Sequence, residues 1–192
     1  VLGVPFATFL APGLIAMAMI QNAFANASFS LLVGKIQGNI VDYLMPPLSV
    51  GELIAGLVGA SVTRAFLVGF AVWLAMLLWP DVSVAVRYPL ISLWFALMGA
   101  LMLSFLGLMT SIWAEKFDHA ATITNFVVTP LSLLSGTFYA VDALSPTFRA
   151  LSRVNPFFYV ISGFRAGFLG VSDSPLLIGG LVLLAINLAL LT

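Results

Sequence analysis

Long runs of apolar residues, separated by short polar stretches, dominate this chain and decide what it can fold into. A helix needs about 20 apolar residues to cross the hydrocarbon core of a bilayer. Measured against that length, the apolar runs are residues 5–28, 53–79, 88–113, 120–141, 156–171 and 175–192. The run 156–171 is short and contains three glycines and Arg165, which favours a re-entrant or interfacial helix over a full crossing. The pattern predicts an all-α integral membrane protein.

Composition supports the same fold class and excludes several functions. Of the 192 residues, 62% are hydrophobic and 7% are charged, whereas a soluble domain has roughly 25% charged residues. The formal net charge is zero, so no basic surface is available for nucleic acid. The chain has no cysteine and one histidine, His119. We therefore expect no disulfide, no metal site and no cofactor.

The common catalytic motifs are absent from the sequence. It contains no G-x-x-x-x-G-K-[ST] phosphate loop, no H-E-x-x-H and no G-x-S-x-G elbow. The first four apolar runs contain no Asp or Glu, which disfavours a proton-coupled pump. We expect a subunit that is not an enzyme and has no catalytic residue. Because the chain begins at Val1 and ends inside an apolar run, we also expect a fragment of a longer protein.

The segment before Pro46-Pro47 has the periodicity of an amphipathic helix. Its polar side chains fall opposite one apolar stripe, and the two prolines end the helix. The stripe consists of Ile36, Ile40, Val41, Leu44 and Met45. The pattern alone permits two interpretations: a helix lying on the membrane surface, or a docking helix for a soluble partner.

Two further polar features lie inside the apolar runs. Arg64 stands about eleven residues into the second run, where a charge costs roughly 2.5–3.5 kcal/mol to insert. It is either a pathway or dimer-contact residue, or a structural partner for a polar group on another helix. The fourth run contains Asn125 and Pro130 among several Thr and Ser residues. These residues either line a cavity or pack between helices.

Four motifs, in this order, resemble the permease subunits of bacterial ABC-2 type transporters. The first is the helix ending at Pro46-Pro47, which leads through Leu48 to Glu52. The second is Pro130 followed by Gly136-Thr137-Phe138-Tyr139, and the third is the turn Leu144-Ser145-Pro146. The last is Asn155-Pro156-Phe157 with Arg165 downstream. Together they cover about 130 of the 192 residues, and the last segment most resembles the inner-membrane branch of YadH-like and polysaccharide-exporting permeases.

The resemblance implies a topology and a set of partners. It implies a multi-pass protein of the bacterial inner membrane, with about five spans present and the first span missing. It makes 35–49 a cytoplasmic coupling region and 142–173 an external re-entrant hairpin. The partners are two ABC ATPase subunits, a second permease in a homodimer, and membrane lipids. Counting Lys35 and Lys116 against Arg87, Arg149 and Arg153 would place the cytoplasm on the other side, but the coupling helix must face the ATPase.

The resemblance also assigns residues. The ATPase-coupling set is Ile36, Ile40, Val41, Leu44, Met45, Pro47, Leu48 and Glu52. The transport or structural set is Arg64, Asn125, Pro130, Gly136, Asn155, Pro156 and Arg165. The expected function is ATP-driven export of a lipid, polysaccharide or drug. The alternatives are a secondary transporter, which would need related halves with ion sites, and a non-transporting scaffold.

Overall fold

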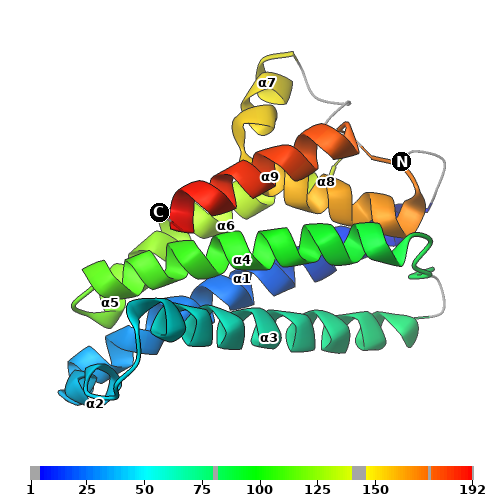
Figure 1. Cartoon of the computed structure of the whole chain (residues 1–192). Helices are drawn as coiled ribbons and strands as arrows, with labels where there is room; N and C mark the ends of the chain where they lie inside the picture. Colours follow the sequence, from blue (N-terminus) through cyan, green and yellow to red (C-terminus); the bar gives the residue numbers. More distant parts are fainter. Residues whose placement is uncertain (1–4, 80–81, 140–145, 173, 192) are drawn as a thin grey trace.

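The computed structural model describes residues 5–79, 82–139, 146–172 and 174–191, and the regular structure within these ranges is helical (Figure 1). The elements are α1 (Phe6–Gln37), α2 (Ile40–Leu44), α3 (Val50–Leu77), α4 (Pro89–Trp113), α5 (Phe117–Ile123), η1 (Thr124–Val128), α6 (Thr129–Ser132), η2 (Leu133–Thr137), α7 (Pro146–Val154), α8 (Pro156–Leu169) and α9 (Leu176–Leu191). The elements η1 and η2 are π-helical. The predicted all-α membrane fold is confirmed.

Local sequence signals set the ends of the long helices. Ser49 and Glu52 form a reciprocal capping box at the start of α3. Pro89 occupies the first turn of α4, where its missing N–H leaves no partner unsatisfied. Gly38, with φ 76°, ends α1 in a left-handed conformation. The predicted run 5–28 was therefore too short: α1 has 32 residues, about 48 Å of helix, and extends past the bilayer core at the α2 end.

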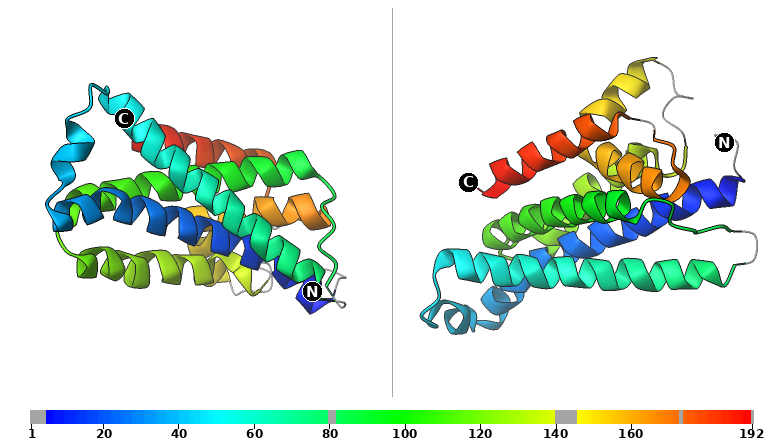
Figure 2. Two further views of the ribbon diagram at one scale, coloured as in Figure 1. Left: turned by 90° about the horizontal axis from the view of Figure 1, so that it is seen from below. Right: turned by 45° about the vertical axis from the view of Figure 1, so that its right-hand side comes forward.

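The helices form one bundle with α4 at its centre. α1 and α4 run in the same direction and α3 runs against both, while α8 and α9 cover the other side of α4 (Figures 1 and 2). α1 and α4 approach closely, because a Cβ on Gly107 would lie 2.6 Å from the Phe24 carbonyl oxygen. α2 lies at the end of the bundle away from the N-terminus, and α7 projects from the bundle (Figure 2).

Helix length separates the membrane crossings from the shorter elements. Among the described residues α1, α3 and α4 are long and apolar enough to cross a membrane, and α9 is a shorter apolar helix of 16 residues. The segment Phe117–Thr137 runs antiparallel to α1, since Phe117 packs on Phe29 and Thr137 approaches Gly13. α8 has 14 residues, about 21 Å, which is shorter than the roughly 30 Å core.

Candidate functional site

The α2 end of the bundle differs from the single amphipathic helix that the sequence predicted. Gly38 separates Ile36, in the last turn of α1, from the five-residue helix α2. The predicted stripe is therefore wrong as one continuous helical face. Ile40 packs inward on a small cluster of Leu31, Val58 and Leu108, so it does not belong to an exposed face. The signal for this break was in the sequence: a glycine just after a basic last turn commonly ends a helix.

The other predicted coupling residues form an exposed apolar surface, which we call the α2 surface. Met45 is 76% exposed, and Ile36, Val41 and Leu48 are each at least 42% exposed. Pro47 is also exposed, and the exposure of the Leu44 side chain lies outside the description. Glu52 has a local role at this end, because its carboxylate accepts hydrogen bonds from the Ser49 backbone N–H at 2.8 Å and hydroxyl at 2.7 Å.

Lys35 links the α2 end to the end of α4, a role that sequence reasoning missed. Its ammonium donates to the carbonyl oxygens of Ser111 at 2.8 Å, Ala114 at 3.2 Å and Ile112. These carbonyls lie at the C-terminus of α4, where helical carbonyls have no intrahelical partner and the macrodipole favours a cation. Tyr43 of α2 packs against Gly34 one turn of α1 away. α2, the end of α1 and the end of α4 are thus held together.

The segment Phe117–Thr137 is a broken helix, divided into α5, η1, α6 and η2. Pro130 has no N–H for the Phe126 carbonyl, so the α-helical ladder is interrupted there. Gly136 has φ 80° inside η2, a conformation that glycine adopts without a Cβ penalty. Asn125 is exposed on η1. Backbone carbonyls freed at depth in a membrane need replacement donors.

Arg165 of α8 supplies one set of donors. It is 1% exposed, and its Nη2 donates to the carbonyl oxygens of Gly136 at 2.8 Å and Thr137 at 3.4 Å. Its guanidinium carbon lies 3.9 Å from the centre of the Phe9 ring, a cation–π contact. Gly13 leaves room for it, since a Cβ there would lie 3.2 Å from Nη2. The arginine therefore joins the end of the broken helix to α1.

Asn155 supplies a second donor and also begins α8. Its Oδ1 accepts from the Phe157 N–H at 3.0 Å, and its Nδ2 donates to the Leu131 carbonyl at 2.7 Å. Pro156 occupies the first position of α8. The Asn-Pro pair thus caps α8 and fastens it to the broken helix. The structure brings four predicted residues together here, Pro130, Gly136, Asn155 and Arg165, and leaves Asn125 apart from them.

Arg64 lies on α3 with an exposed side chain. Its Nη1 donates to Asn26 Oδ1 at 3.1 Å, and Asn26 Nδ2 donates to Ser61 Oγ at 3.0 Å. This polar chain crosses from α3 to α1 within the apolar bundle. The sequence showed Asn26 as a polar residue in an apolar run, but it gave no indication that Asn26 pairs with Arg64.

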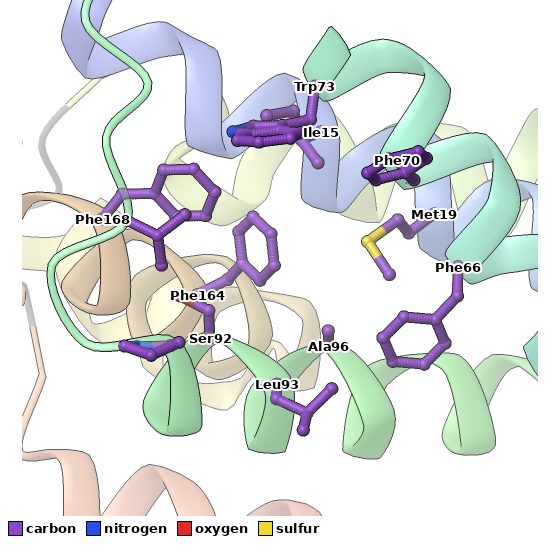
Figure 3. Close-up of a pocket in the computed structure, with 13 residues that line it drawn as sticks. Ile15, Met19, Phe66, Phe70, Trp73, Ser92, Leu93, Ala96, Phe164 and Phe168 are labelled. Carbon is purple, nitrogen blue, oxygen red and sulfur yellow. The ribbon is translucent and has the colours of Figure 1, made fainter.

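A groove of about 280 Å³ lies between α1, α3, α4 and α8, towards the end of the bundle opposite α2. Figure 3 shows Phe66, Phe70 and Trp73 of α3 facing Leu93 and Ala96 of α4 across it, with Phe164 and Phe168 of α8 beside them. The lining is apolar apart from Ser92 and the indole N–H of Trp73. Such a groove has no arrangement of groups suited to acid–base or nucleophilic chemistry.

These features define the class of protein. Within the part of the chain that the structure describes, no group of three or more His, Cys, Asp or Glu side chains could hold a metal ion. What the bundle has instead is polar side chains holding an irregular crossing in place, and an exposed apolar surface beyond one end. This arrangement is typical of an α-helical membrane transport subunit.

The family follows from comparison with known proteins. The model of the ABC-2 type transporter family matches residues 1–169, and the chain belongs to that family. It is 38% identical over 174 residues to the inner membrane transport permease YadH of Escherichia coli (strain K12), which covers 91% of this chain and 67% of YadH. Nodulation protein J of Neorhizobium galegae is 27% identical over 189 residues, covering 94% of this chain and 70% of that protein. The chain is thus a transmembrane permease subunit of an ABC exporter.

Proposed function

We propose that this permease works as a homodimer in the bacterial inner membrane, with two ABC ATPase subunits docked on the α2 surfaces. The substrate is a lipid, polysaccharide or drug. The family membership and the printed name of YadH, an inner membrane transport permease, support the location and the ATPase partner. ATP-driven movement of the ATPases would push on α2, and the link through Lys35 would pass that movement to α4.

The exposed α2 surface is the observation that carries this proposal. Val41, Met45 and Leu48 lie beyond the ends of the long crossings and point away from the core. Apolar side chains exposed outside the bilayer are costly unless a partner covers them. A soluble ATPase with a complementary apolar groove would cover them, in the way that helices dock into grooves.

The test is co-purification of the permease with its ATPase. We expect Val41→Asp and Met45→Asp to abolish co-purification, because each buries a charge in the docked interface. Val86→Asp is the matched control, since Val86 is exposed at the opposite end of the bundle. All three variants should insert at wild-type yield. Wild-type recovery of the ATPase with both α2 variants would refute the docking proposal.

The homodimer is proposed to form through the first half of α3. Gly56 and Ala60 lie one turn apart and are exposed, and nothing lies within 4 Å of a Cβ placed on Gly56. Small residues at this spacing let helices of two subunits approach closely. We expect Ala60→Cys to form a disulfide between two subunits, and Leu67→Cys, two turns further along α3, to do so much less. Equal crosslinking of both variants would contradict this interface.

The region 142–173 is proposed to be external and re-entrant. Its first residues, 142–145, lie outside the described part of the chain, but α8 is too short to cross and the Tyr88 N–H donates to the Gly167 carbonyl at 2.7 Å. Both ends of α8 therefore lie in one half of the bundle. We expect Ser172→Cys to react with an impermeant thiol reagent added outside. Met45→Cys should react only after the inner face is opened. Reaction of both cysteines from the same side would contradict this topology.

A further inference from the structure

We propose that the groove between α1, α3, α4 and α8 is a binding site for a glycerophospholipid of the bilayer. One acyl chain fills the groove, the Ser92 hydroxyl donates to an ester carbonyl, and the Arg87 guanidinium binds the phosphate. The site is separate from the α2 surface and does not depend on ATPase docking.

The depth of the lining residues gives the groove a direction. On α4 the lining begins at Pro89 and ends at Ala96, and on the antiparallel α3 it begins at Trp73 and ends at Phe66. Pro89 and Trp73 lie near the end of the bundle opposite α2, and Ala96 and Phe66 lie deeper. The groove therefore runs inward from that end, along the direction of the acyl chains in a bilayer.

Ser92 is the polar group that indicates a ligand. It is 7% exposed, lines the groove, and its Oγ has no hydrogen-bond partner in the structure. The other lining donor, Trp73 Nε1–H, is already bonded to the Val84 carbonyl at 3.0 Å. A buried hydroxyl without a partner costs free energy. An ester carbonyl of a lipid would accept its proton, which a hydrocarbon chain alone cannot do.

Arg87 supplies the charge that a phosphate needs. It is exposed just before α4 and lies between Val86 and Pro89, two lining residues at the mouth of the groove. The neighbouring Tyr88 ring lies 5.7 Å from its guanidinium carbon, and tyrosines favour the membrane–water interface. The first turn of α4 adds the positive end of its dipole. From Tyr88 to Ser92 the helix rises about 6 Å, so cation, hydroxyl and apolar groove follow in the order of phosphate, ester and acyl chain.

The site can be tested by photocrosslinking in nanodiscs. The permease is reconstituted in phosphatidylethanolamine containing a small fraction of phosphatidylglycerol with a diazirine on one acyl chain. After irradiation, we expect adducts on peptides containing Phe66–Trp73 and Leu93–Ala96. Leu93→Trp should lower their yield by filling the groove. Met109→Trp is its matched control, because Met109 is on the same helix, also 53% exposed, and outside the groove; it should leave the yield unchanged.

Two more variants distinguish a phospholipid from any apolar chain. Loss of a charge-assisted contact in Arg87→Gln should weaken occupancy about tenfold, and loss of a neutral hydrogen bond in Ser92→Ala about fivefold. With a diazirine-bearing fatty acid methyl ester, which has no phosphate, Arg87→Gln should have no effect. Wild-type adduct yield of the phospholipid in both variants would overturn the proposal. So would an inter-subunit disulfide in Leu93→Cys, because a second copy would then cover the groove.

Discussion

α4 and the segment Phe117–Thr137 are both apolar and similar in length, yet only α4 is an uninterrupted helix. α4 has its one proline at the first position, whereas the other segment has Pro130 and Gly136 in its interior. α4 satisfies its own backbone and packs through small residues. The broken helix depends on donors from another element, Arg165 and Asn155. An irregular crossing is therefore stable only together with the element that supplies its missing hydrogen bonds.

The largest expected effect on this comparison comes from Arg165→Met. The change removes the charged donor to the Gly136 and Thr137 carbonyls and leaves them buried, at a cost of about 3 kcal/mol. We expect a clear fall in the unfolding midpoint in detergent and partial recovery in Arg165→Lys, which keeps the charge but loses the planar fork. Arg153→Met, at an exposed arginine on α7, is the control. A midpoint equal to wild type would show that the broken helix does not need Arg165.

Gly107→Ala tests the regular side of the comparison. The new Cβ would lie 2.6 Å from the Phe24 carbonyl oxygen and 2.8 Å from the Ala27 Cβ, so α1 and α4 must move apart. We expect a loss of about 2 kcal/mol in stability, measured by the same thermal assay. Gly56→Ala, where nothing lies within 4 Å of the Cβ, should be neutral or slightly stabilising. Similar destabilisation by both changes would contradict the packing argument.

Asn155→Ala should have a smaller effect, about 1.5 kcal/mol, because it removes the cap of α8 and the bond to the Leu131 carbonyl. Asn155→Ser should recover the cap but not the longer reach to Leu131. Asn22→Ala removes only a bond within α1, to the Ala18 carbonyl, and serves as the control. The thermal assay decides the order; a serine variant as stable as wild type would show that the Leu131 bond contributes nothing.

Pro130→Ala should change stability least, by under about 1 kcal/mol, because it supplies an N–H to the Phe126 carbonyl while the segment keeps its other contacts. It should make the broken helix more regular. Hydrogen exchange of peptides covering 117–137 should therefore slow, while exchange in α4 peptides stays the same. Unchanged exchange in 117–137 would mean that Gly136, and not Pro130, causes the irregularity.

Predictability followed the same division. The predicted runs 53–79 and 88–113 differ from α3 and α4 by at most three residues at either end, because apolar length and caps such as Ser49 and Pro89 are local signals. The predicted run 5–28 missed the last turns of α1, since the polar residues Lys35 and Gln37 look like a loop once the apolar run stops. The π-helical turns and the Lys35 contacts depend on residues distant in sequence, and no local pattern encodes them.

The candidate residues divide in the same way. The motif order pointed to Pro130, Gly136, Asn155 and Arg165, and the structure supplies their hydrogen bonds. Ile40 was assigned to a partner-facing stripe because the periodicity was read across Gly38 without regard to the glycine. Ser92 could not be singled out from the sequence, since a serine in an apolar run usually bonds to its own helix.

The central position of α4 also constrains the order of biogenesis. α4 contacts α1 and α3, which leave the ribosome before it, and α8 and α9, which leave after it. Until α8 arrives, its side of α4 at Phe95 and Gly99 is uncovered, because Gly163 and Val160 are what pack there. α8 is too short to act as a stop-transfer segment. We therefore expect its entry into the membrane to be a late step, driven by docking onto helices that the translocon has already released.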